Sequence, residues 1–251
     1  TLSVDNGTAT TSGAINVGTF GIATANVTNG ATLESTGSSI SIGSGSTGDG
    51  ELYVDGGSVT AASGMNIGTA GTGLLDISNG GMVNAGNNTV SVAASLGSSG
   101  EMYVDGEGST FAVSSGIQVG NRDIGYIEIT DGADVSSSST FFGVFGESAD
   151  GSGSIDGVGS TWTTSGQTAV GYESVGLLEI SNGGLFSGNQ TLIGDQDTGD
   201  GELYVRNGGM YDGSDVLYVG RRGLGLLTVE AGGMVENDGR GAIGVSSGSE
   251  G

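Results

Sequence analysis

The chain has 251 residues, of which 55 are glycine, and it contains no proline, cysteine or histidine. It carries 28 acidic and 5 basic residues, which give a net charge of −23. This composition excludes disulfide bonds, thiolate or histidine zinc sites and histidine-dependent catalytic triads. A chain this acidic is repelled by nucleic acids and by anionic lipids. No apolar run approaches the roughly 20 residues of a membrane helix, so we expect no nucleic-acid partner and no direct membrane insertion by this segment.

Short segments of alternating apolar and polar residues recur from the first residues onward, where Thr1 to Val4 already has the pattern of a strand. One family of copies begins at about every fiftieth residue, at Gly50–Gly56, Gly100–Gly106, a weaker copy from Gly151, and Gly201–Asn207. A second family lies between these copies, at Gly73–Gly80, Gly125–Gly132, Gly176–Gly183 and Gly225–Gly232. Together they give a unit of about 25 residues, which is within the range of solenoid repeats.

Each unit has the same internal order. It opens with Gly-x-Φ-x-Φ, where Φ is apolar, and continues with a turn that is often Asn-Gly, as at Asn79-Gly80. One apolar residue follows in a Ser, Thr and Gly setting, as at Phe111 or Trp162, and the unit closes on Φ-x-Φ-Gly. The alternation predicts short strands with one face inward, and Asn and Gly suit sharp corners because they accept a positive φ.

One unit has too few apolar residues to form a core, so successive units must stack in register. The sequence therefore predicts an all-β fold, a single parallel β-helix (β-solenoid) over residues 1–251, with about ten rungs. We expect a right-handed winding, because parallel crossovers strongly prefer that hand. Phe111 and Trp162 share one place in the unit and are expected to fill the core. Propeller blades and a sandwich are the alternatives, but the half-period copies favour stacked rungs.

The outward positions of the first strand indicate that the full period is two rungs. The first outward column reads Thr24, Glu51, Leu74, Glu101, Tyr126, Ser152, Leu177, Glu202 and Leu226. The second reads Asn26, Tyr53, Asp76, Tyr103, Glu128, Ser154, Glu179, Tyr204 and Thr228. Alternation keeps like charges about 9–10 Å apart, near the Debye length, instead of directly opposed. The exposed Tyr residues also offer stacking surfaces for glycans or a protein partner.

These units resemble the β-helix repeats of Gram-negative autotransporter passenger domains and related large adhesins. The resemblance rests on the Gly-x-Φ-x-Φ, Asn-Gly-Gly and Φ-x-Φ-Gly motifs and covers essentially the whole chain. It implies secretion to the bacterial surface, a right-handed β-helix, and adhesion or display. The translocator barrel of that family is not in this segment, and no catalytic residues carry over.

Catalysis is not expected, although some β-helix proteins act on polysaccharides with paired carboxylates. The one irregular acidic cluster runs from Asp195 to Glu202. Oxygen ligands from Asp195, Asp197 and Asp200 in a Gly-containing loop are suited to Ca²⁺, and a solvated polar corner is the alternative. We expect the basic pair Arg221-Arg222 to neutralise acids such as Asp215 or Glu230.

Neither end shows a polar cap, and Ser249-Glu250-Gly251 has the pattern of the start of another rung. We therefore expect a segment of a longer chain or, alternatively, a subunit that stacks end to end into a fibre. The function expected from the sequence is a secreted or cell-surface scaffold, such as an adhesin stalk or filament component that contacts a host or glycan surface. The alternatives are a β-helix that binds or degrades polysaccharide and a Ca²⁺-dependent binding module.

Overall fold

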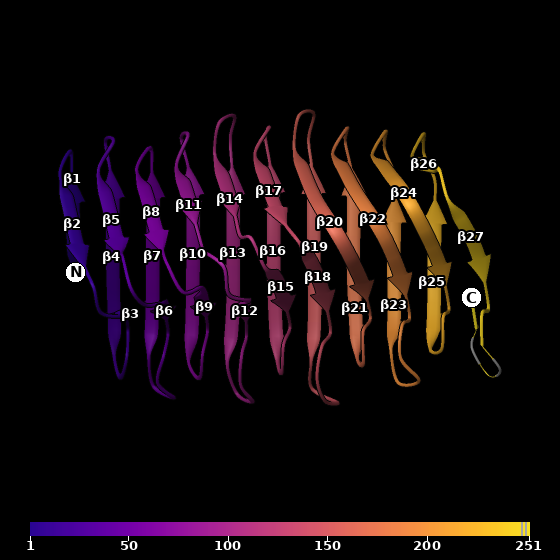
Figure 1. Ribbon diagram of the computed structural model, residues 1–251, viewed down its shortest axis with the longest axis horizontal. Coiled ribbons are helices and arrows are strands. Elements are labelled where there is room, and N and C mark those ends of the chain that lie inside the picture. Colours follow the sequence, from indigo (N-terminus) through magenta and orange to yellow (C-terminus); the bar gives the residue numbers. More distant parts are fainter. Residues whose placement is uncertain (247, 249) are drawn as a thin grey trace.

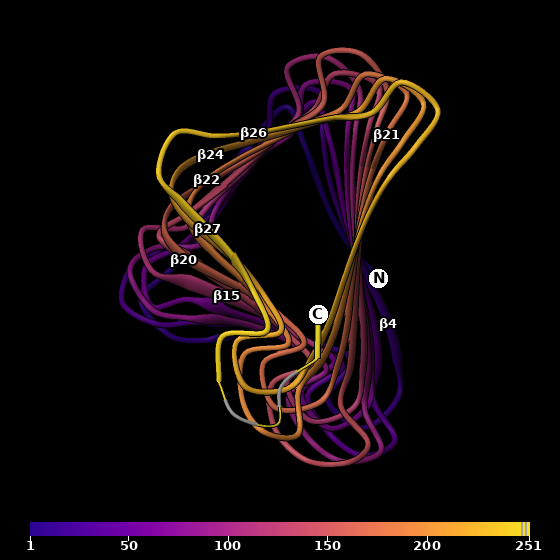
Figure 2. The same ribbon diagram turned by 90° about the vertical axis from the view of Figure 1, so that its right-hand side faces the viewer.

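The computed structural model describes residues 1–246, 248 and 250–251, and it contains 27 strands and no helix among them. The strands form a rod whose axis runs from the N-terminal to the C-terminal rung (Figure 1). The rod has a triangular cross-section, and a view from the C-terminal end shows the chain winding counterclockwise toward the viewer (Figure 2). The fold is therefore a right-handed β-solenoid, as the sequence predicts.

One side of the triangle, face A, is a ten-stranded parallel sheet. Each of its strands opens one rung, and we number the rungs 1 to 10 in this order. The strands are β1 (Leu2–Asp5), β4 (Ile22–Thr28), β7 (Asp49–Asp55), β10 (Thr72–Ser78), β13 (Ser99–Asp105), β16 (Ile124–Thr130), β19 (Asp150–Asp156), β21 (Val175–Ser181), β23 (Asp200–Val205) and β25 (Leu224–Val229).

The other two sides, faces B and C, belong to one 17-stranded sheet that bends around a corner. Face B contains β2 (Thr8–Thr11), β5 (Thr32–Ser35), β8 (Ser58–Ala61), β11 (Met82–Asn84), β14 (Thr110–Ala112), β17 (Asp134–Ser137) and β26 (Met234–Asn237). Face C contains β3 (Ile15–Val17), β6 (Ile40–Ile42), β9 (Met65–Ile67), β12 (Val90–Val92), β15 (Gly116–Val119), β18 (Ser139–Phe142) and β27 (Arg240–Ile243). Three longer strands span both faces, β20 (Thr161–Val170), β22 (Leu185–Ile193) and β24 (Met210–Val219).

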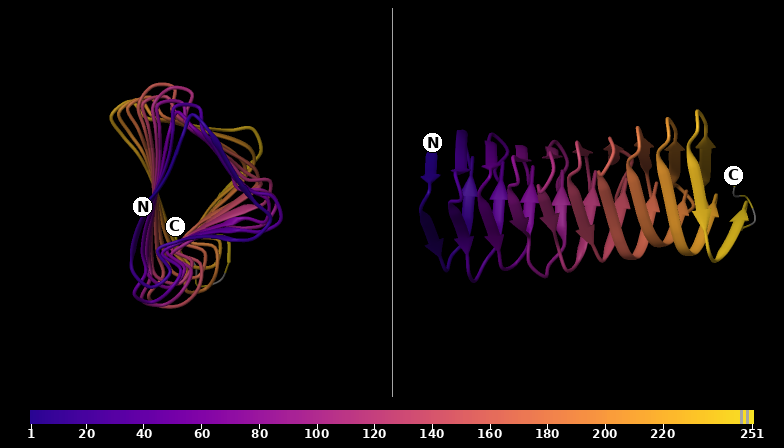
Figure 3. Two further views of the ribbon diagram at one scale, coloured as in Figure 1. Left: turned by 90° about the vertical axis from the view of Figure 1, so that its left-hand side faces the viewer. Right: turned by 90° about the horizontal axis from the view of Figure 1, so that it is seen from above.

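The rungs stack in register. Leu75 pairs with Leu52 on one side and with Met102 on the other, so equivalent apolar residues lie directly above one another. All three side chains are fully buried. In Figure 3 the rungs overlap one another in the view along the rod and repeat along its length in the view from above. Burial of these columns along the axis gives the fold a core that no single rung supplies.

The interior compensates for large side chains with small ones. Phe111 and Trp162 occupy the inward column of face B, as expected, with Val135 between them. At rung 7 the facing column of face A carries Gly153 where its neighbours carry Ile127 and Leu178. A Cβ atom on Gly153 would lie 2.8 Å from Phe142 and 3.3 Å from Trp162. Gly153 in the weak copy of the repeat therefore makes room for the Phe142 and Trp162 rings.

The corner between faces A and B depends on residues that accept a positive φ. Asn29, Asn79 and Asn182 have φ values of 55°, 52° and 51° at this corner. Such values are strained for most side chains and favour Asn and Gly. The Asn-Gly turns of the sequence therefore mark one edge of the triangular rod.

Burial of the core decreases in the terminal rung. Ile243, in the inward column of face C, is 71% exposed, and the same column is buried in rungs 2 to 9. Among the described residues, the strands of rung 10 pair with rung 9 on one side, and on the other side Leu224 forms a parallel bridge with Glu250. This bridge agrees with the expected start of another rung at residues 249–251, of which Ser249 lies outside the described residues.

Candidate functional site

The outward surface of face A carries the predicted columns of Glu and Tyr residues. The register confirms both columns, since Glu101 pairs with Leu74 and Tyr126, and Tyr103 pairs with Asp76 and Glu128. In rungs 5 and 9, a Tyr hydroxyl donates a hydrogen bond to the Glu two residues earlier, at 3.0 Å for Tyr103–Glu101 and 2.9 Å for Tyr204–Glu202. Each of these Glu-x-Tyr pairs therefore places a carboxylate, which accepts hydrogen bonds, next to an aromatic ring on the exposed face of the sheet.

Two of these tyrosines lie against each other. The Tyr103 and Tyr126 rings have centroids 6.0 Å apart in an edge-to-face arrangement. Burial, together with the neighbouring glutamates, raises the pKa of each phenol to about 12. The phenols therefore keep their protons at neutral pH and act as hydrogen-bond donors with an uncharged ring.

A second feature of face A is a column of acids at its corner with face B. Asp5, Asp55 and Asp156 each accept a hydrogen bond from the Asn of the next rung. The distances are 2.7 Å from Asn29, 2.7 Å from Asn79 and 2.5 Å from Asn182 to the respective Asp Oδ1 atoms. Asp105 instead accepts from Thr130 at 2.6 Å.

These corner bonds also repeat every two rungs, because Asp alternates with Ser or Thr, as in the pairs Asp55–Ser78 and Asp105–Thr130. The sequence predicts the Asn-Gly turns, whereas these cross-rung bonds are seen only in the structure. The signal was present in the alternation of Asp-Gly and Asn-Gly at equivalent turns.

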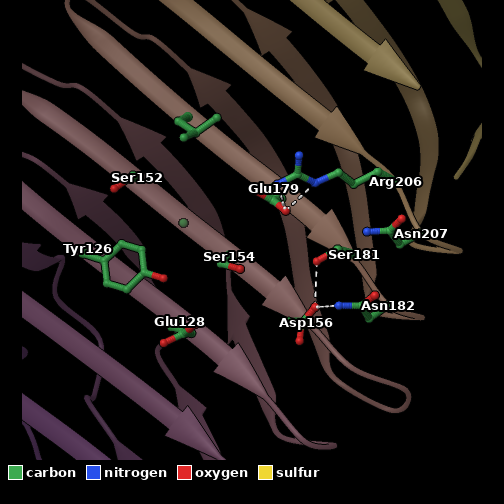
Figure 4. A pocket seen from close by; sticks show the side chains of 12 residues that line it. Tyr126, Glu128, Ser152, Ser154, Asp156, Glu179, Ser181, Asn182, Arg206 and Asn207 are labelled. Carbon is green, nitrogen blue, oxygen red and sulfur yellow. Dashed lines mark hydrogen bonds and ion pairs between the residues drawn. The ribbon is translucent and has the colours of Figure 1, made fainter. Parts of the chain in front are cut away.

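The outward columns are interrupted at rung 7. Ser152 and Ser154 stand where rungs 3, 5 and 9 carry Glu and Tyr, so the surface is hollowed there. The depression has a volume of about 450 Å³. Figure 4 shows Tyr126 and Glu128 on one side of the two serines and Glu179 with Arg206 on the other. Both serines lie in the outward columns expected from the sequence, where no function was predicted for them.

Arg206 is held over this depression by acids. Its guanidinium lies 2.5 Å from Glu179 Oε1 and 4.0 Å from Glu230 Oε1. Its Nε also donates a hydrogen bond to Glu179 at 2.7 Å. In rung 9, Arg206 occupies the position that is Asp in rungs 1, 3, 5 and 7. Its positive charge therefore lies among the carboxylates that line the depression.

The three residues predicted for Ca²⁺ lie in different environments. Asp195 is fully buried, and its Oδ1 atom forms an ion pair with Nε of Arg221. The Oδ1 and Nε atoms are not aligned as a hydrogen bond. Asp197 and Asp200 are exposed and line a separate depression with Glu147 and Glu173. In the part of the chain that the structure describes, no group of three or more acidic side chains is placed to hold a metal ion. The three aspartates therefore do not come together as ligands.

The expected partners of the basic pair are wrong. Arg221 pairs with Asp195 from the preceding rung, and Arg222 Nη1 donates to Gln196 Oε1 at 2.9 Å. Glu230 instead lies near Arg206. The register explains these partners. The residue after the closing glycine of each rung lies directly above the equivalent residue of the preceding rung. Asp195 follows Gly194 and Arg221 follows Gly220, so their side chains meet.

Burial raises the pKa of Asp195 above its ordinary value, and Arg221, Gln196 and Arg222 oppose that shift. Its second oxygen, Oδ2, is 3.3 Å from Gln196 Nε2 and 3.5 Å from Gln167 Nε2. The carboxylate is therefore occupied by protein donors, which makes it a structural group of the corner.

No helix of the described residues is long and apolar enough to cross a membrane. Comparisons with protein-family models, with curated proteins and with solved structures gave no match to this chain.

Proposed function

We propose that this chain is a rod-shaped structural segment of a secreted or cell-surface protein, a scaffold of the adhesin-stalk or filament kind. The observation that carries the proposal is the unbroken register of face A from β1 to β25. Ten strands at about 4.8 Å spacing extend about 45 Å along the axis, which suits a spacer that holds other parts of a protein at a fixed distance.

The surface chemistry supports the same role. Acids on face A are at least two rungs apart within each column and accept hydrogen bonds from neighbouring Asn, Ser, Thr and Tyr side chains. With a net charge of −23, rods repel one another and resist lateral aggregation. Strand edges, which would otherwise pair with other proteins, are covered by the next rung along the stack.

Localisation of the native protein tests this proposal. Antibodies against the rod, applied to intact and to sectioned cells that produce it, are expected to label the outer surface or extracellular filaments in immunoelectron microscopy. Protease added to intact cells should remove the label. Labelling confined to the cell interior, unaffected by external protease, would contradict a surface scaffold.

A further inference from the structure

We propose that the depression at rung 7 of face A is a binding site for a neutral oligosaccharide, which lies along β19 across the rod. This proposal goes beyond the scaffold role and does not depend on where the protein resides. It rests on one interruption of the repeat and on the side chains that border it.

The site exists because two large side chains are replaced by two small ones. Rungs 3, 5 and 9 carry Glu51 and Tyr53, Glu101 and Tyr103, and Glu202 and Tyr204 at the two outward positions. Rung 7 carries Ser152 and Ser154 at the same positions, as the register with rungs 6 and 8 shows. The core does not require this change, because both serines point outward and the inward residue between them is Gly153.

The walls of the depression stand two rungs apart. Tyr126 and Glu128 form one wall, Leu177 and Glu179 form the other, and the two serines form the floor (Figure 4). The backbones of the walls are about 9–10 Å apart, so the space between their side chains admits one extended chain and not a folded domain.

The depression continues along the strand. It shares Ser152 and Leu177 with an adjoining hollow of about 300 Å³, which in turn shares Val175 and Asp200 with one of about 570 Å³. The three form a groove from the corner at Asn182 and Asn207 to the loop edge at Asp197. Seven residues of β19 span about 23 Å, which is room for a short linear ligand.

The chemistry of the groove selects the ligand. Glu128, Glu179 and Asp156 are acceptors for hydroxyl groups, the two serines and Asn207 both donate and accept, and Arg206 is a donor held in place by Glu179. The Tyr126 ring offers an apolar surface next to these polar groups, which is the combination that binds polyhydroxylated rings.

The same lining disfavours other ligands. Polyanions such as uronate polymers and nucleic acids are repelled by the carboxylates. A peptide strand gains its affinity from a free sheet edge, and every strand around rung 7 is paired on both sides. The depression at rung 7 has one aliphatic side chain, Leu177, and the rest of the groove adds only Val175 and Leu224, which is too little apolar surface for a hydrophobic ligand.

Nuclear magnetic resonance titration of the whole chain tests the site. The probes are maltotetraose, cellotetraose and N-acetylchitotetraose, with tetragalacturonate as the anionic comparison. At least one neutral tetrasaccharide is expected to shift the backbone amides of residues 126–128, 152–154 and 177–179, and tetragalacturonate is not. Shifts from none of the neutral probes at millimolar concentration, or shifts confined to other rungs, would overturn the proposal.

Restoring the repeat provides the decisive variant. Ser152→Glu with Ser154→Tyr rebuilds the pair found at rung 5, where Glu101 also lies between a Leu and a Tyr and Tyr103 lies between two acids. The double variant is therefore compatible with the fold, and unchanged circular dichroism and thermal midpoint should confirm this. It fills the groove, so the amide shifts should disappear. Binding that persists in the folded double variant contradicts the site.

The matched control removes an equivalent pair elsewhere. Glu51→Ser with Tyr53→Ser at rung 3 makes the reverse change in composition far from the groove, and binding at rung 7 should be unchanged. Tyr126→Ala should weaken binding by roughly tenfold through loss of ring stacking, whereas Tyr126→Phe should retain it. Equal binding by Tyr126→Ala and by the unaltered chain would show that the ring is not a wall of the site.

Discussion

Among single residues, Asp195 departs most from what its surroundings in the sequence predict. It lies in an acidic, Gly-containing stretch, yet its side chain is fully buried and faces Arg221 from the next rung. A buried carboxylate is tolerated when it is paired, and removal of one partner leaves an uncompensated charge. Asp195 and Arg221 therefore stabilise the corner as a unit.

We expect Arg221→Ala to lower the free energy of unfolding by about 3 kcal/mol, because it leaves the Asp195 carboxylate buried without its cation. Urea denaturation followed by circular dichroism measures this loss. Arg222→Ala is the control, since Arg222 donates to a side-chain amide at an exposed position and should cost well under half as much. Adding Asp195→Asn to Arg221→Ala should restore part of the stability. Equal losses for the two arginine variants would contradict this account.

Asp76 gives the rod a predicted pH dependence. Burial, followed by the charges of Asp105 and Asp55, raises the pKa of Asp76 above its ordinary value. The folded chain therefore binds a proton that the unfolded chain has released, at pH values just above the ordinary carboxyl pKa of about 4. In this window the free energy of unfolding falls as pH rises, because ionisation is less favourable in the folded state.

Asp76→Asn should therefore raise the urea midpoint at pH 7 and reduce the decline in stability between the ordinary and the raised pKa. Urea unfolding at a series of pH values from 3.5 to 7 tests both effects. Glu34→Gln on face B removes one charge away from these acids and serves as the comparison. A lower midpoint for Asp76→Asn at pH 7 would show that the carboxylate is stabilising there.

At the scale of the strand, rung 7 shows how a degenerate repeat is tolerated. Its face A strand lacks an apolar residue at Gly153, and the space is filled by Phe142 from face C of rung 6 and by Trp162 from face B of rung 7, whose rings lie 5.5 Å apart. The number of apolar residues that a strand needs therefore depends on the side chains supplied by its own rung and by the preceding rung. The core tolerates substitution when the total volume of the layer is kept.

Gly153→Leu should destabilise the rod by about 1–3 kcal/mol, because the new side chain overlaps both rings. Trp162→Val should also destabilise it, by about 3 kcal/mol, because it leaves a cavity. The double variant is expected to lose clearly less than the sum of the two, since Leu then occupies the space of the indole and Val matches Val135 in the same column. Urea unfolding by circular dichroism measures all three. Additive losses would show that the two positions are not coupled.

For the whole molecule, the two-rung period controls electrostatic stability. Deletion of residues 72–98 removes rung 4 and places Glu51 beside Glu101 and Asp55 beside Asp105. Deletion of residues 49–98 removes rungs 3 and 4 and places Thr24 beside Glu101, as it lies beside Glu51 in the intact rod. Both deletions preserve the inward columns, so they differ mainly in the alternation of outward charges.

We expect the one-rung deletion to have the lower thermal midpoint in low salt, since each directly opposed acid pair costs roughly 0.2–1 kcal/mol. Its midpoint should rise more steeply between 20 and 500 mM NaCl, because salt screens charges at this distance. Differential scanning calorimetry of both deletions and of the intact chain measures the effect. The same salt dependence in the two deletions would show that the alternation of acids between neighbouring rungs does not affect the thermal midpoint.

The sequence alone determined the solenoid, its number of rungs, the register and the inward columns. These follow from local rules, because alternation directs side chains in or out, Asn and Gly specify the corners, and a recurring unit of about 25 residues brings equivalent residues together. Tertiary structure decided the partner of Asp195, the Asp–Asn bonds between rungs and the groove at Ser152 and Ser154. Each of these joins residues about one rung apart in the sequence, whose side chains meet only after the chain has wound once around the core. Their outcome depends on side-chain length and direction at the corners, which the periodic pattern does not encode.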